Sequence, residues 1–208
     1  MLNILQMSLL MLFHPKDALD IIKRERTTFK PLRPFLLMLA LALVNYTYTF
    51  YVNYVLGTKT PEQANIMLDF AIAFLPLLTW VVSAYAITAI VVGECSITEF
   101  LTASSYCLTP IIVLKPLLGL LSLILTSGEA DIFNGLCILM YAWTIILLIF
   151  TLKHLNDYSL LKTVAVVFIS IVAMLIIWGV IILMFTLFAQ VVSFINDLVH
   201  EFQLKYWA

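Results

Sequence analysis

The chain has 208 residues, of which 63% are apolar and only 11% are charged, and its formal net charge is −1. Soluble domains are about 45–50% apolar and about 25% charged, so the composition indicates an integral membrane protein with little room for a soluble domain. The near-neutral net charge gives no global positive field of the kind that attracts nucleic acid. We therefore expect the lipid bilayer as a partner and nucleic acid as none.

The first 33 residues are expected to form helices at the cytoplasmic membrane surface. Residues 1–13 are apolar but too short to cross a bilayer, and their leucines recur at helical spacing, which predicts an interfacial helix. His14-Pro15 ends this segment. A second, basic helix is expected over Lys16–Arg26, which would bind either anionic lipid or a protein partner.

The rest of the chain predicts an all-α, polytopic membrane fold. About 20 apolar residues cross the hydrocarbon core as a helix, and five stretches are long enough: Pro34–Val55, Phe70–Val92, Phe100–Thr126, Ile132–Leu152 and Val164–Phe194. We expect residues 34–194 to form one five-helix membrane domain. Residues 195–208 should extend the last helix beyond the membrane.

The distribution of lysine and arginine predicts the orientation. Eight basic residues lie before the first span or between the fourth and fifth spans, whereas two lie in the opposite segments, at Lys59 and Lys205. Cytoplasmic loops carry the excess of lysine and arginine. The N-terminus is therefore expected inside the cell membrane and the C-terminus outside.

The third span is too long to cross as one straight helix. Ser96 and Glu99 form a capping-box pattern at its start, and a helix from there to Ser127 would be about 46 Å long. Pro110 and Pro116 predict a kink. We expect a turn at the Lys115–Pro116 step, in the outer part of the bilayer.

Lys115 has three interpretations. Its ammonium could reach water along the four-carbon stem near the interface, could bind Asp69 or a partner's carboxylate within an interface, or could serve an ion pathway. Asp69 lies at the outer edge of the second span, where a boundary position is the simpler interpretation.

Two further features could contact a partner. Small residues at Ser83, Ala86 and Gly93 form a stripe along the second span that would allow close helix packing, within the protein or with a neighbouring subunit. The last helix reads without a break from Ser159 to about Lys205, and its end keeps an apolar face that includes Leu198 and Phe202.

No catalytic, cofactor or metal motif occurs in the sequence. The three histidines fall on different sides of the predicted membrane, and Cys95, Cys107 and Cys137 have neither zinc-site nor disulfide spacing. No phosphate loop, nucleophile elbow or zinc-protease motif is present. A transporter would more often show several buried ionisable groups or inverted repeats.

Several short stretches together resemble the Yip family of five-span membrane proteins, and in particular its small bacterial members. They are Phe13-His14-Pro15 with Asp17 and Lys23–Arg26, Gly93-Glu94-Cys95-Ser96 followed by Pro110, Asp157-Tyr158-Ser159 with Lys162, and 189–195 in the last span. One departure stands out. The family often has a histidine three residues before the serine of the last loop, where this chain has Asn156.

The resemblance implies a non-enzymatic protein without a cofactor. Some bacterial members resemble accessory proteins of ABC-type sugar importers, which predicts a membrane accessory subunit or scaffold bound to an ABC-type permease. Two alternatives stay open. One is a free-standing membrane-organising or trafficking-type protein that acts through its N-terminal helix, and the other is a small transporter or channel.

Overall fold

The computed structural model describes residues 4–24, 32–52 and 64–207. The fold is all-α, as predicted, and the five helices long and apolar enough to cross a membrane confirm the five expected spans. The elements are α1 (Ile4–Phe13), α2 (Pro15–Arg24), α3 (Leu32–Tyr51), α4 (Ile66–Ile90), α5 (Ile97–Tyr106), α6 (Thr109–Ser122), the short 3₁₀ helix η2 (Ser127–Glu129), α7 (Ala130–Leu155) and α8 (Leu160–Trp207).

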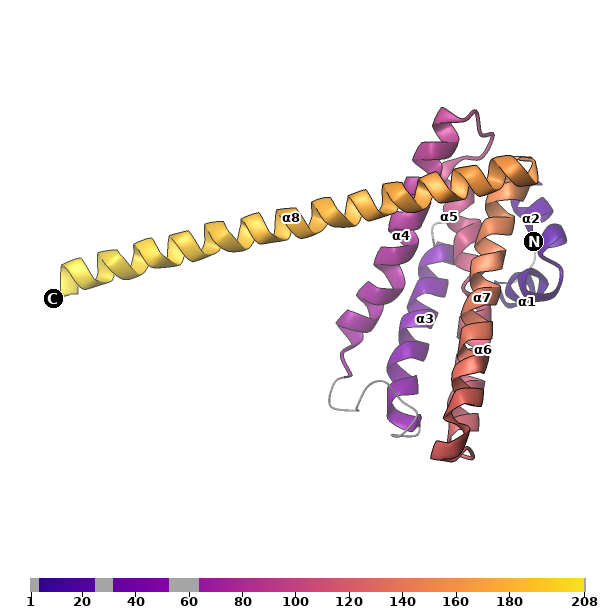
Figure 1. Cartoon of the computed structure of the whole chain (residues 1–208), viewed down its shortest axis with the longest axis horizontal. Coiled ribbons are helices and arrows are strands. Elements are labelled where there is room, and N and C mark those ends of the chain that lie inside the picture. Colours follow the sequence, from indigo (N-terminus) through magenta and orange to yellow (C-terminus); the bar gives the residue numbers. More distant parts are fainter. Residues whose placement is uncertain (1–3, 25–31, 53–63, 208) are drawn as a thin grey trace.

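Four columns of helix stand side by side in the bundle: α3, α4, α5 with α6, and α7 (Figure 1). One end of the bundle, which we call the α2 end, holds α2 together with the 91–96 and 156–159 loops. At the opposite end α3 and α6 finish and α4 and α7 begin. Apolar side chains fill the core, with one cluster around Tyr106 and Leu147 and a second around Met38 and Leu77.

The third span is interrupted, as its prolines predict, but earlier than the expected turn. Its helix breaks at Cys107–Leu108, and α6 then continues through Pro116 to Ser122. The turn expected at Lys115–Pro116 is therefore wrong. Pro110 explains the position of the break because it has no N–H to donate to the Tyr106 carbonyl. The Thr109 hydroxyl donates to that carbonyl instead, at 2.6 Å.

The expected start of the third span is confirmed. The Ser96 hydroxyl accepts a hydrogen bond from the Glu99 N–H, and the Glu99 carboxylate accepts one from the Ser96 N–H. This reciprocal pair satisfies two backbone donors that a helix N-terminus leaves without intrahelical partners. The cap fixes the start of α5 at the α2 end of the bundle.

α8 differs from every other long helix. Its first half packs mainly against α4, with Thr163, Val166 and Ser170 buried, and the Trp178 indole N–H donates to the Thr79 hydroxyl at 3.3 Å. Beyond this bond, every described side chain from Gly179 to Asp197 is exposed. Figure 1 shows α8 crossing the bundle and extending far past it.

The N-terminal helices lie against the bundle. α1 contacts α5 and α6 and buries Met7 and Met11, whereas Leu5, Leu9 and Phe13 are exposed. α2 contacts α5 and α7. The end of the expected basic helix, including Arg26, lies outside the described residues. The predicted surface segment therefore includes two helices whose inner faces are covered by the bundle.

The two ends of the bundle should lie on opposite sides of the membrane, with the α2 end in the cytoplasm, as the basic residues predict. In a cysteine-free background, Gly128→Cys should react with an impermeant maleimide in intact cells. Glu94→Cys, in the 91–96 loop, should react only after permeabilisation. Labelling of Glu94→Cys in intact cells together with protection of Gly128→Cys would reverse the orientation.

Candidate functional site

Lys115 is held by side chains of the neighbouring helix α3. Its ammonium donates a hydrogen bond of 2.6 Å to the Asn45 side-chain oxygen and lies 4.9 Å from the centre of the Tyr48 ring. One turn further along α6, Gly119 lies directly against the rings of Tyr48 and Tyr51, where an added methyl group would overlap them. The missing side chain at Gly119 therefore lets α3 approach α6 closely enough to place Asn45 at Lys115.

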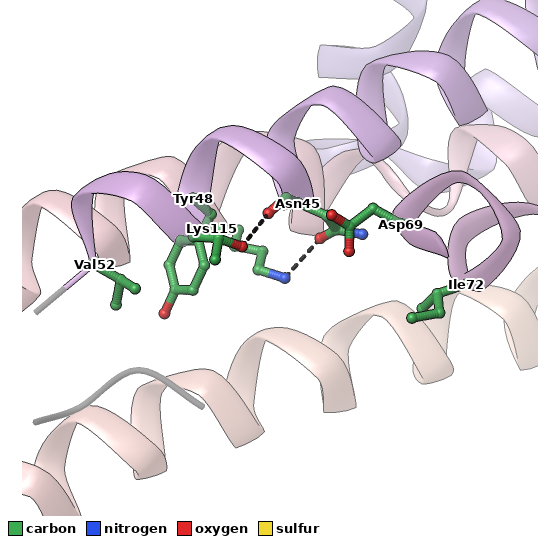
Figure 2. Close-up of a pocket in the computed structure, with 7 residues that line it drawn as sticks. Asn45, Tyr48, Val52, Asp69, Ile72 and Lys115 are labelled. Carbon is green, nitrogen blue, oxygen red and sulfur yellow. Dashed lines mark hydrogen bonds between the residues drawn. The ribbon is translucent and has the colours of Figure 1, made fainter. Parts of the chain in front are cut away.

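Lys115 and Asn45 line a cavity of about 180 Å³, which we call the Lys115 cavity. Asp69 of α4 also faces this cavity and is only 2% exposed. Figure 2 shows the ammonium of Lys115 and the carboxylate of Asp69 both directed toward the Asn45 side chain. Lys115 and Asp69 come from different helices and line the same cavity. A contact with Asp69 was one of the three interpretations of Lys115 and stays a hypothesis.

The Lys115 cavity lies near one end of the bundle and not at its middle. Lys115 is seven residues before the end of α6, or about 10 Å along the helix, and Asn45 is six residues before the end of α3. Asp69 is in the first turn of α4. These three residues therefore belong to the end opposite α2, where a lysine costs less to place than at the bilayer centre.

The other predicted contact residues are spread over the molecule. Ser83 is buried and donates to the Thr79 carbonyl, whereas Ala86 is exposed, so these two members of the stripe do not share one packed surface. Pro116 lies within α6. Phe202 is exposed near the end of α8, and the side chain of Leu198 lies outside the described residues.

The helix α2 forms a second polar site that the sequence did not predict. Its Lys23 pairs with Asp157 at 2.5 Å, and the His154 ring meets the Asp20 carboxylate at 2.8 Å. Between these pairs, Leu19 and Ile22 are buried. The hydrogen bond from His154 lowers the pKa of Asp20, and the hydrogen bond to Asp157 raises the pKa of Lys23. We call this contact the α2 docking site.

Gly93 holds the two loops beneath the α2 docking site together. A methyl group at Gly93 would lie only 2.5 Å from the Asn156 side-chain oxygen and 2.9 Å from the Tyr158 hydroxyl. That Asn156 oxygen accepts a hydrogen bond from the Cys95 N–H, and its amide nitrogen donates to the Leu152 carbonyl. Gly93 is therefore required here for close approach, and Asn156 links the 91–96 loop to the end of α7.

The Gly93–Cys95 and Asn156–Ser159 stretches, which lie 61 residues apart at their hydrogen bond, meet at this end of the bundle together with α2. The model of the Yip1 domain matches residues 9–183, which is most of the chain. The chain belongs to the Yip1 domain family. No curated protein and no solved structure matches it.

The Yip1 family generally consists of non-enzymatic membrane proteins. The residues of the α2 docking site all lie within the matched region. The matched region contains α2, both loops and the first half of α8, and it ends at residue 183, shortly after the exposed stretch of α8 begins at Gly179. Within the described residues, no group of three histidine, cysteine, aspartate or glutamate side chains could hold a metal ion.

Gly93→Ala should lower the thermal stability of the purified protein. The new methyl group would displace the Asn156 amide and weaken its bond to Cys95, at a cost of about 1–3 kcal/mol. Gly128→Ala is the matched control because nothing lies within 4 Å of that position. Unfolding midpoints measured in one detergent should fall by several degrees for Gly93→Ala alone. Equal midpoints for the two variants would contradict the close-contact argument.

Lys115→Leu should insert into the membrane normally, because leucine enters a bilayer more favourably than lysine. The Asn45 oxygen would lose its Lys115 donor, so the defect should appear in folding stability or assembly. Membrane extraction, thermal unfolding and co-purification measure these effects. Loss of solute flux through the purified protein, with stability and assembly intact, would instead favour the transporter interpretation.

Proposed function

We propose that this Yip1-domain protein is a non-enzymatic accessory subunit or scaffold of the cell membrane, and that it holds another integral membrane protein along the second half of α8. The observation that carries the proposal is the exposure of all described side chains from Gly179 to Asp197, in a helix that leaves its own bundle. A membrane helix ordinarily packs against the other helices of its own domain, and the described side chains in this half of α8 do not.

Exposure alone does not indicate a protein partner, because lipid covers an apolar helix as well as protein does. The length of α8 is the stronger argument. Its apolar part, Leu160–Asp197, is about 57 Å long, whereas the hydrocarbon core is about 30 Å thick. An excess of this kind is accommodated by tilting, kinking or local thickening of the bilayer. Because α8 is continuous and crosses the bundle (Figure 1), we expect it to tilt and so to present a long apolar surface at a distance from the Yip1 domain.

The family match also separates the two halves of α8. Residues 184–208 lie outside the matched Yip1 domain, and the described side chains among them are exposed. The match therefore does not extend into this half, although residues 189–195 are among the stretches that resemble the family. We take the part of α8 beyond the matched domain as the place for a contact that is particular to one complex.

The partner we propose is an ABC-type sugar import permease, which is the association implied by the resemblance to small bacterial Yip proteins. In this arrangement the N-terminus is cytoplasmic and the C-terminus is outside. The protein would stabilise or position the permease and would contribute no catalytic group.

A second candidate is a free-standing membrane-organising protein, and α1 is the feature that favours it. Leu5, Leu9 and Phe13 are exposed on this short helix, so they could enter one leaflet while Met7 and Met11 hold the helix to the bundle. Purified protein that deforms vesicles and that co-purifies with no other membrane protein would favour this second function.

Two phenylalanines of α8 provide a matched test of the proposed function. Phe188 is 68% exposed in the second half, and Phe168 is 69% exposed in the half that packs on the bundle. Phe188→Ala, and truncation after Phe194, should each reduce the amount of permease that co-purifies in mild detergent. Phe168→Ala should not.

The result is interpreted only where the variants insert and are extracted to the same extent as the unaltered protein. Equal recovery of the permease with all variants would exclude the second half of α8 as the contact. A protein that stays monomeric and alone in mild detergent and in native lipid would contradict the subunit proposal itself.

A further inference from the structure

Two cavities of different chemistry meet at Lys115. The Lys115 cavity is lined by Asn45, Thr49, Asp69 and Lys115 among its seven residues. A larger cavity of about 540 Å³, which we call the apolar cavity, adjoins it and shares Asn45, Ile72 and Lys115. Its other lining residues are apolar or aromatic and come from α3, α4, α6, α7 and α8.

The two cavities follow one another along the bundle. The Lys115 cavity reaches Val52 and Asp69, at the ends of α3 and α4 that lie opposite the α2 end. The apolar cavity continues deeper, past Pro76 to Trp80 on α4, and Met174 of α8 contributes to its lining. Polar groups near the end of the bundle and apolar groups toward its middle match the order of headgroup and acyl chain in a membrane lipid.

The Lys115 cavity is lined by one positive and one negative side chain, which together restrict the headgroup that would fit it. A purely anionic headgroup would meet the Asp69 carboxylate, and a cationic headgroup would meet the Lys115 ammonium. A zwitterionic headgroup is complementary to both charges, because a lysine binds phosphate and a primary ammonium group donates to a carboxylate. The Asn45 amide, directed toward both charged groups in Figure 2, can donate to a phosphate oxygen.

We infer that the protein binds one phospholipid with a primary-ammonium, zwitterionic headgroup, of the phosphatidylethanolamine type. Its phosphate lies at Lys115 and Asn45, its ammonium lies at Asp69, and one acyl chain occupies the apolar cavity. This lipid site is independent of the partner proposed for α8.

The size of the two cavities fits this ligand. A water molecule takes about 30 Å³ in the liquid, so the Lys115 cavity is large enough for a group of several atoms. The apolar cavity lies within the range of about 300–1,000 Å³ that is usual for small-molecule sites. Ile145 lines this cavity and is 56% exposed, so a chain could enter beside it from the surrounding lipid.

Native mass spectrometry of the full-length protein, with lipids of identical acyl chains added singly and in pairs, tests the inference. One phosphatidylethanolamine should be retained about tenfold more strongly than phosphatidylcholine, whose quaternary ammonium cannot donate a hydrogen bond, and than phosphatidylglycerol, which has no ammonium. Glycerophosphoethanolamine, which has the headgroup without the chains, should not displace the bound lipid at equal concentration.

Variants separate the headgroup from the chain. Lys115→Leu should lower the retention of phosphatidylethanolamine about tenfold, and Asp69→Asn should remove the preference for it over phosphatidylglycerol. Ile145→Trp should lower retention of every phospholipid by filling the apolar cavity. Ile138→Trp is its matched control, because Ile138 lies two turns away on the same face of α7, is similarly exposed and does not line that cavity.

Asn45→Leu replaces Asp69→Asn as the headgroup variant if the latter fails to fold, and it should lower retention of phosphatidylethanolamine. Equal retention of the three lipids, or no effect of Lys115→Leu and Ile145→Trp, would mean that only ordinary surrounding lipid is bound and would overturn the inference. Displacement by glycerophosphoethanolamine would show that the apolar cavity takes no part, and would overturn the lipid assignment.

Discussion

The close approach of Gly93 to Asn156 is the contact on which the α2 end of the bundle depends. α4 and α7 both end here, with a Gly93 N–H to Thr88 carbonyl bond and a Tyr158 N–H to Lys153 carbonyl bond closing their last turns. Because Gly93 has no side chain, the two loops can touch, and Asn156 then joins them through Cys95. This junction fixes His154 and Asp157, the residues that hold α2, and it also sets where α8 begins. A displaced Asn156 would therefore affect α2 and α8 together.

The helices themselves could be predicted from the sequence because hydropathy and capping are local properties. Five apolar stretches, the Ser96–Glu99 cap and the unbroken last helix are each encoded within one continuous segment. The break in the third span shows the limit of such patterns. The two prolines predicted a kink but not its position. The helix breaks before Pro110, where the Thr109 hydroxyl donates to the Tyr106 carbonyl in place of the N–H that Pro110 lacks. The replacement of a backbone hydrogen bond by this side-chain hydrogen bond is not visible in the hydropathy of the segment.

The polar contacts could not be predicted because they join residues far apart in the chain. Lys115 meets Asn45 across 70 positions, and Lys23 meets Asp157 across 134. The Asn156 position illustrates the difficulty. This chain has Asn156 where the family often has a histidine, and Asn156 joins two loops, while His154, two residues earlier, contacts Asp20. Gly93 was singled out as part of a small-residue stripe, and its tight neighbour belongs to another loop.

The hydrogen bond between Trp178 and Thr79 has a mechanical consequence for α8. It is the last described hydrogen bond between α8 and the bundle, and about 44 Å of helix extends beyond it. A continuous helix of this kind acts as a lever whose pivot lies at the crossing with α4. A rotation of about 10° at the pivot would move the far end of α8 by about 8 Å, given that length. Small rearrangements around Thr79 would thus be amplified into large displacements at the C-terminus.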